Sequence, residues 1–357
     1  MKLQFNLTDT HDDLGRFASR SDLEKLLAGF DGIELMHLEE DVSGILTTDM
    51  VTGYHMSFPE YWMDFWRGDL EKCILEFDTL DNVRRYYHGD TPEALIRMVR
   101  KQYENALAYG AEYAVIHVSD AAIFEEITGK YKYTDAEVID GFSELINAAI
   151  PVRADSDGNR YEESPWLLLE NLWQPGLNFK DPDMTARLMD AVRYPKKGIM
   201  FDTGHLMHTE PELKTQKEAV QFIHERLDAH KDLCRYIKGL HLHQSLTGSI
   251  LKRYKKHPPL PAKTYEERAV QLFEYVFRVD QHKPFTGEGV KELVERIDPL
   301  YMTFEFISSS LEEHRKLLRR QRTCLQSLCF HNESVKTGDQ SGEYKEDQKN
   351  RDQCSDR

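Results

Sequence analysis

Residues 166–171 read WLLLEN, an unbroken apolar run that ends on a carboxylate and an amide. Residues 198–202 read GIMFD and residues 237–243 read IKGLHLH, so each again places an acid or a histidine after apolar residues. Continuous apolar runs of this length are typical of parallel strands that are buried on both faces. The three segments therefore predict a parallel sheet whose strands end in chemically active side chains.

Further runs of the same kind lie on both sides of these segments and alternate with helical patterns. Eight strands that alternate with helices favour a closed (β/α)₈ TIM barrel over an open doubly wound sheet, and no glycine-rich nucleotide loop follows the first strand. We expect one barrel domain over residues 1–325, followed by a disordered polar tail over residues 326–357. The expected strands are 3–7, 32–36, 51–55, 113–118, 166–171, 198–202, 237–243 and 302–306, and the expected helices are 22–30, 92–109, 135–149, 182–192, 216–230, 265–277 and 311–321.

The composition limits where the protein works and what it binds. The chain has 357 residues and a formal net charge of -16, so its surface repels phosphate backbones and argues against a general nucleic-acid binder. The first residues lack the apolar segment of a secretory signal, and no run is long enough to cross a membrane. The five cysteines show no paired spacing. A cytoplasmic protein with reduced thiols is the simplest interpretation.

Histidines and acids follow the predicted strands with unusual regularity. All strand ends of a barrel converge on one mouth, and carboxylates mixed with imidazoles suit Zn²⁺, Mn²⁺, Co²⁺ or Fe²⁺ better than Ca²⁺. A single strand-end histidine is more often structural, and a single acid often caps a helix, so the metal prediction depends on convergence. Glu34 faces the same mouth and could orient a ligand. The other residues at these ends are His55, His117, Glu170, Asp202, His205, His241, His243 and Glu305.

Residues 280–289 read DQHKPFTGEG, a D-x-H…G-x-G segment. With the strand ends, this pattern resembles the xylose isomerase-like TIM barrel superfamily over about residues 1–325. That superfamily includes sugar and sugar-phosphate isomerases and epimerases, and the endonuclease IV enzymes of AP endonuclease family 2. The resemblance implies a divalent-metal quartet of Glu170, Asp202, His241 and Glu305. It further implies that His205, Asp280 and His282, together with His55 and His117, provide the remaining ligand types of a three-zinc endonuclease site.

His243 departs from the family pattern. The alignment implied by the resemblance makes His241 the ligand, and His243 then occupies a position that usually holds a small polar residue. Both side chains point to the same side of a strand, so either could reach a metal, and His243 could instead contact the substrate.

Two chemistries follow from the resemblance. In a sugar or sugar-phosphate isomerase or epimerase, Glu170 and Glu305 would bind the metal and move the proton beside a carbonyl. The aromatic connection after the third strand, with Trp62 and Trp66, would then stack on the sugar, and Lys283 could anchor a phosphate. The alternative is a zinc-dependent hydrolase of abasic DNA, in which Phe58 or Trp62 would wedge into the duplex.

The acidic charge and the aromatic connection favour a small sugar substrate and carbohydrate metabolism, so the sequence prediction is an isomerase or epimerase. Nucleic acid is expected as a partner only under the alternative. A barrel that binds a metabolite without turnover is disfavoured because no member of the metal quartet is missing.

Overall fold

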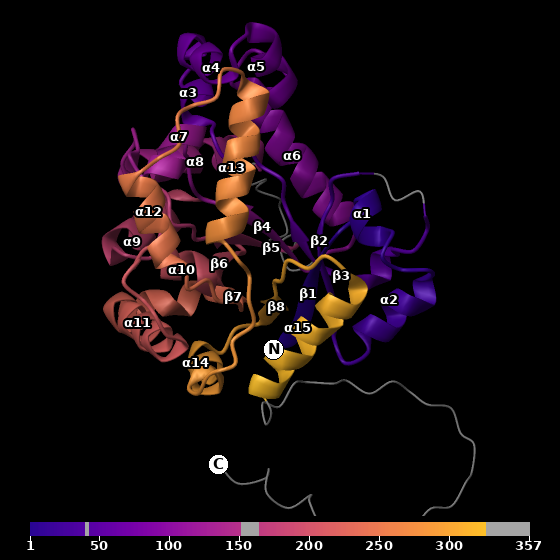
Figure 1. Cartoon of the computed structure of the whole chain (residues 1–357). Helices are drawn as coiled ribbons and strands as arrows, with labels where there is room; N and C mark the ends of the chain where they lie inside the picture. Colours follow the sequence, from indigo (N-terminus) through magenta and orange to yellow (C-terminus); the bar gives the residue numbers. More distant parts are fainter. Residues whose placement is uncertain (40–42, 151–163, 326–357) are drawn as a thin grey trace, which may run out of the picture.

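A computed structural model describes residues 1–39, 43–150 and 164–325. Within these residues, eight parallel strands form a closed barrel in the order β1 to β8, and β8 pairs with β1. Figure 1 shows the strands at the centre and helices around them. The predicted TIM barrel is confirmed, whereas the predicted tail, 326–357, lies outside the described residues. The strands are β1 (Lys2–Thr8), β2 (Gly32–Met36), β3 (Val51–His55), β4 (Tyr113–His117), β5 (Trp166–Glu170), β6 (Lys197–Asp202), β7 (Ile237–His241) and β8 (Tyr301–Phe304).

The seven predicted helices are present with bounds within a few residues of the prediction, because several carry strong start signals; the described residues contain eight further helices that were not given bounds, α1, α3, α4, α5, α7, α10, α12 and α14. Thr134 caps α8 by accepting from the backbone of Glu137, whose side chain reaches back to the cap, and the same capping box starts α11 and α13. The helices are α1 (His11–Leu14), α2 (Arg20–Leu27), α3 (Met63–Trp66), α4 (Leu70–Phe77), α5 (Leu80–Tyr87), α6 (Glu93–Ala108), α7 (Ile123–Thr128), α8 (Asp135–Ala149), α9 (Pro182–Ala191), α10 (Thr203–His208), α11 (Gln216–His230), α12 (Gly248–Lys256), α13 (Tyr265–Val279), α14 (Val290–Ile297) and α15 (Leu311–Cys324), with short 3₁₀ turns at Thr48–Met50 and Lys231–Tyr236.

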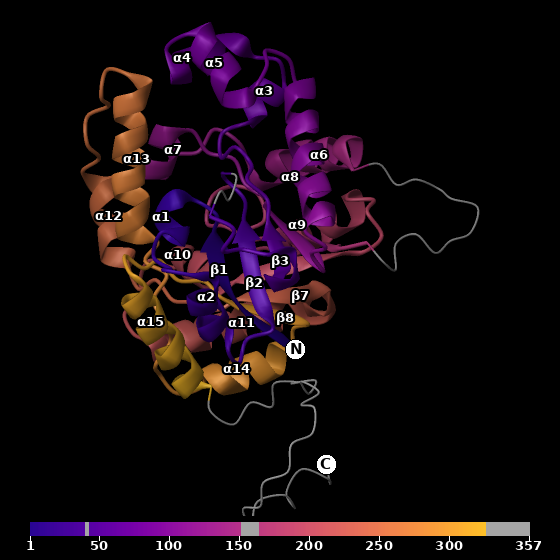
Figure 2. The same ribbon diagram turned by 90° about the vertical axis from the view of Figure 1, so that its right-hand side faces the viewer.

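The two long connections of the barrel hold helices of their own. The connection after β3 carries α3, α4 and α5, and the one after β7 carries α12 and α13. In Figure 2, α3, α4 and α5 lie at the top of the molecule and α12 and α13 at the left. No helix in the described ranges combines the length and the apolar character that a membrane crossing requires.

Side-chain alternation along the strands decides which residues reach the mouth. Leu168 and Met200 belong to a small cluster inside the barrel, whereas Leu167 and Leu169 belong to the larger core beneath the helices. Side chains two positions apart on a strand point to the same face. The residues two positions after Leu168 and Met200 therefore point inward at the carboxyl ends of their strands. They are Glu170 and Asp202.

Candidate metal centre

Glu170 lies at the centre of the mouth and is 0 % exposed. Its Oε1 atom is 3.1 Å from Nδ1 of His241 and 3.3 Å from Nδ1 of His205. Its Oε2 atom is 3.1 Å from Nε2 of His55 and 3.5 Å from Nε2 of His117. The two oxygens of one buried carboxylate thus face histidines from four different elements, and Glu170 connects two halves of the mouth.

The described residues contain three groups whose potential ligand atoms lie within 4.8 Å of one another. Asp280 adjoins one of them, since its Oδ2 atom is 2.7 Å from Nε2 of His282 and 3.4 Å from Nε2 of His205. The structure therefore brings together every residue that the sequence predicts as a ligand. The groups are His55, His117 and Glu170; Glu170, Asp202, His241 and Glu305; and His205, His243 and His282.

Two of the histidines contact a carboxylate through the ring nitrogen that faces away from Glu170. Nε2 of His241 is 2.9 Å from Oε1 of Glu34. Nδ1 of His117 is 2.9 Å from Oε1 of Glu60. Glu34 is fixed in turn, because it accepts hydrogen bonds from the hydroxyls of Tyr113 and Thr303.

Backbone carbonyls hold two further histidines in the same way. Nδ1 of His205 is 3.0 Å from the carbonyl oxygen of Asn171, and Nδ1 of His282 is 3.1 Å from that of Glu305. Histidines that bind metals normally use one ring nitrogen as ligand and the other in such a hydrogen bond. The side chains of this mouth therefore fit divalent cations.

The electrostatics of the mouth favour cations of any kind. Burial would raise the pKa of Glu305, but His241 and His282 outweigh it and lower that pKa to about 2. Burial would lower the pKa of His282, but Asp280 and Glu305 outweigh it and raise that pKa to about 9. Burial would also raise the pKa of Glu170, but His241 and His117 outweigh it and hold that pKa well below its usual value. Protons on histidines and divalent metal ions are alternative ways to neutralise these carboxylates.

His243 is fully buried and tightly enclosed. Its ring stacks on that of His282, with 4.0 Å between the centroids and 7° between the planes. Gly204 also lies against this ring, since an added Cβ there would stand 2.1 Å from Cε1 of His243. Nε2 of His243 is 2.7 Å from Oδ2 of Asp202. His243 can thus orient Asp202 by a hydrogen bond, and it belongs to the histidine group around His205.

The predicted substrate residues are placed differently from the ligands. Trp62 is 0 % exposed, and its indole N–H donates to the carbonyl oxygen of Ser119. It therefore has no exposed face for a sugar or a base, contrary to the expected stacking role. Trp66 and Phe58 are half-buried and pack against the core, with the ring of Phe58 5.7 Å from that of Trp62. Lys283 is exposed, and its backbone pairs with that of Gln244 beside the mouth.

Glu60 is the partner that the sequence analysis missed. It lies in the connection after β3, where no strand or helix period marks a side chain as pointing inward. Its position five residues after His55 carries no recognisable spacing either. A search for acids within a few residues of the strand-end histidines would have included it among several candidates.

The sequence model of a family described as xylose isomerase-like TIM barrel matches residues 27–313. Endonuclease IV from Thermus thermophilus superposes with a TM-score of 0.50 at 15 % identity, over 92 % of this chain and 100 % of that one. A D-tagatose 3-epimerase-like protein superposes with a TM-score of 0.48 at 14 % identity, over 91 % of this chain and 97 % of that one. The IOLI protein, solved with a zinc atom, superposes with a TM-score of 0.42 at 15 % identity, over 91 % of this chain and 96 % of that one. No curated protein matches the chain.

Proposed function

This chain belongs to the xylose isomerase-like TIM barrel family, and on that premise we propose that it is a metal-dependent hydrolase that uses several ions to cleave a phosphate ester. The observation that carries the proposal is the position of Glu170, whose two oxygens face two different groups of histidines. A carboxylate so placed is suited to bridge two ions. Two metal ions about 3.5–4 Å apart are the usual arrangement for phosphoester cleavage.

The same observation disfavours the proton transfer that an isomerase needs. A glutamate that removes a proton from a sugar carbon must keep one oxygen free to face that carbon. Glu170 is 0 % exposed, and histidines lie within 3.5 Å of both of its oxygens. The burial of Trp62 also removes one of the two arguments that favoured a sugar from the sequence.

The residues of the mouth divide among the ions they would hold. His55, His117 and Glu170 would hold one, and the quartet of Glu170, Asp202, His241 and Glu305 would hold a second. His205, Asp280 and His282 would hold a third. When bound, such ions lower the pKa of a water molecule and stabilise the charge on the phosphate and on the leaving oxygen.

The protein itself contributes orientation and access. Glu34 and Glu60 fix the rings of His241 and His117. Glu305 has a side chain that is 14 % exposed, whereas those of Glu170, Asp202 and His241 are fully buried. The substrate phosphate would therefore approach on the Glu305 side. In the reaction, the oxygen of water bonds to phosphorus, the ester P–O bond breaks, and the alcohol leaves with a proton.

The charge of the chain limits the size of the substrate. A net charge of -16 opposes a long polyanion such as duplex DNA, since the affinity of such ligands depends on several cation–phosphate contacts. A small ester with one or two charges is opposed far less, and the local ions would attract it. We therefore propose a small phosphate ester as the substrate.

A sugar isomerase or epimerase is the second candidate, because the quartet that such chemistry requires is complete. It would need only the ion held by that quartet. His55 and His117 would then act as hydrogen-bonding residues and not as ligands.

The variant His117→Asn separates the two candidates. Under the proposal it removes a ligand, and hydrolysis of a panel of phosphate mono- and diesters should fall by more than about 100-fold. The matched control is His88→Asn, at an exposed helix end with a positive φ that asparagine tolerates. Epimerase activity on a ketose panel that survives His117→Asn would support the second candidate. Ester hydrolysis by the His117→Asn variant at the wild-type rate would contradict the proposal.

A further inference from the structure

One face of α13 exposes large apolar side chains. Val270, Phe273 and Phe277 are 57 %, 61 % and 59 % exposed. Their spacing of three and four residues puts them on one side of the helix. Tyr275 and Val279, on another side, are buried in a cluster with α7 and α12. The helix is thus anchored by one face and presents its phenylalanines on the other, and exposed apolar patches of this kind mark binding surfaces.

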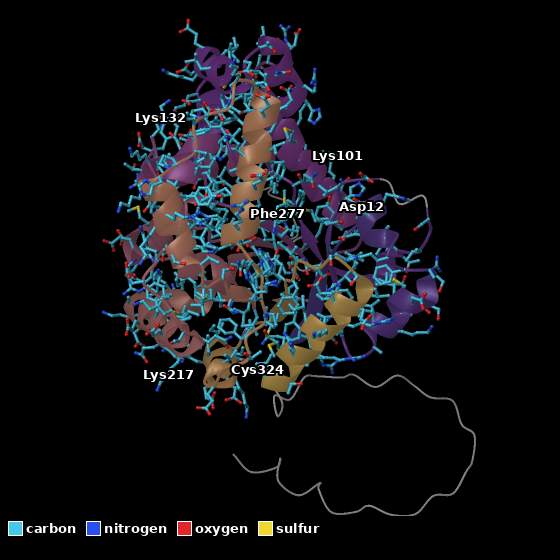
Figure 3. All side chains as sticks on the ribbon, in the orientation of Figure 1. Asp12, Lys101, Lys132, Lys217, Phe277 and Cys324 are labelled. Carbon is cyan, nitrogen blue, oxygen red and sulfur yellow. The ribbon has the colours of Figure 1, made fainter. Side chains whose placement is uncertain are left out.

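The helix that carries this face leads directly into the candidate metal centre. Helix α13 ends at Val279, and the next residues include Asp280 and His282, two of the ligands. Figure 1 shows α13 running down in front of the barrel toward the strands. Figure 3 labels Phe277 near the lower end of this helix. Phe277 precedes Asp280 by less than one helical turn, so the exposed side of the helix leads toward the residues that would hold the substrate.

The two phenylalanine rings can each offer a face to a planar guest. They are roughly parallel, with 25° between the planes and 6.4 Å between the centroids. A flat ring that stacks on one of them needs carbon contacts of about 3.5 Å on one side only. Both side chains are more than half exposed, so a ring can reach either of them.

The size and charge of the surroundings decide what binds there. Aromatic side chains bury roughly 150–250 Å² each, so the exposed parts of these three residues offer a few hundred Å². A stable protein partner needs about 800 Å² on each side, and the net charge of -16 opposes a long nucleic acid. A single planar ring fits this area, and stacking on phenylalanine accepts any base.

We infer that Phe273 and Phe277 form a stacking site for a planar aromatic ring carried by the substrate, so that the substrate is a mononucleotide-like phosphate ester. This inference rests on the proposed function and adds the chemical class of the group attached to the phosphate. The metal centre binds the phosphate, and α13 selects the ring.

The test compares equilibrium binding of two probes that share a phosphate and a ribose. Adenosine 5′-monophosphate carries a planar base, and ribose 5-phosphate does not. Metal-loaded wild-type protein should bind the nucleotide at least about ten-fold more tightly by calorimetry. In the double variant Phe273→Ala/Phe277→Ala that ratio should fall to near one, while the affinity for ribose 5-phosphate stays unchanged. Leu75→Ala, which truncates an exposed leucine of α4 (Leu70–Phe77), is the matched control and should keep the ratio.

Three results would overturn the inference: no preference in the wild type, an unchanged ratio in the double variant, or conversion of a dimer to a monomer by the same substitutions. The last result, from sedimentation, would assign the face to a second copy of the chain. A base preference without hydrolysis of any ester would sink the proposed hydrolase and keep the stacking site. Hydrolysis of esters without a preference for the base would keep the proposed hydrolase and overturn the stacking site.

Discussion

Nε2 of His241 lies 2.9 Å from Oε1 of Glu34, at the floor of the mouth where no solvent reaches either group. This contact turns Nδ1 of His241 toward the other members of the quartet, and Nδ1 lies 3.1 Å from Oε1 of Glu170. Glu34 thus orients the ring of His241, so that Nδ1 is the nitrogen that would bind a metal ion beside Glu170.

Substitution Glu34→Gln should weaken metal binding without removing a ligand. The amide keeps the size of the side chain but is a poorer acceptor for the N–H of His241, and loss of such partners typically costs about 10- to 100-fold in metal affinity. Competition with a chromogenic chelator measures the dissociation constant. Glu112→Gln, at a partly exposed acid that pairs with Lys2 far from the metal quartet in sequence, is the control and should change nothing. Equal affinities in both variants would show that Glu34 has no part in the metal centre.

Substitution Gly204→Ala should destabilise the protein through His243. Alanine would favour the helix by up to about 1 kcal/mol, but its Cβ would stand 2.1 Å from the buried ring of His243. Overpacking of this kind costs about 1–3 kcal/mol, so the clash should win in urea denaturation. His243→Ala removes the ring, and in that background Gly204→Ala should be harmless. A persistent loss in the double variant would locate the strain elsewhere.

Substitution Trp62→Ala should lower stability and leave substrate affinity intact. The indole is fully buried against Phe142 and donates to the carbonyl of Ser119, so truncation should cost about 3–5 kcal/mol in the free energy of unfolding. Trp66→Ala, at a half-buried position, should cost less. A rise in KM of the folded Trp62→Ala protein, with little loss of stability, would restore the substrate role expected from the sequence.

Acid should destabilise the fold through His314 on α15. Burial lowers the pKa of His314 to about 4, Arg16 acts in the same direction, and Asp13 acts against them. Neither ring nitrogen has a hydrogen-bond partner among the described residues. Because the folded pKa is below the unfolded value of about 6.5, the contribution is complete above pH 6.5. It is lost as the pH falls toward about 4, by roughly 3 kcal/mol in all.

The measurement for His314 is the difference in unfolding free energy between wild type and His314→Leu, taken with chelator present from pH 7.5 to pH 4. Groups common to both proteins cancel in this difference. A difference that does not change with pH would contradict the assignment.

The barrel and the convergence of its strand-end acids and histidines could be predicted because both depend on short periods in the sequence. Buried parallel strands are continuous apolar runs, and the strand bounds at β2 and β3 agree with the structure residue for residue. The two-residue alternation of a strand then carries Glu170 and Asp202 into the mouth. The segments that connect the strands follow no such two-residue alternation.

The roles of Trp62 and Glu60 depend on how the connection after β3 folds, and this could not be read from the sequence. An aromatic-rich loop exposes its rings or buries them according to how it folds, and here Trp62 is buried against Phe58 and against Phe142 of α8. The fold of the same connection places the carboxylate of Glu60 beside His117, and no sequence period marks that position. Phe273 and Phe277 lie in the predicted helix 265–277. The sequence does not indicate which face of that helix is buried, so it does not predict that these two rings are exposed.

Elemental analysis of the purified protein tests the central claim most directly, because it counts the ions that the mouth holds. We expect about three divalent metal ions per chain, and one fewer in the variant His55→Asn/His117→Asn. One ion per chain that this variant retains would contradict the bridging role of Glu170 and favour the isomerase. A chain that binds no metal even after incubation with Zn²⁺, Mn²⁺ or Co²⁺ would contradict the metal centre itself.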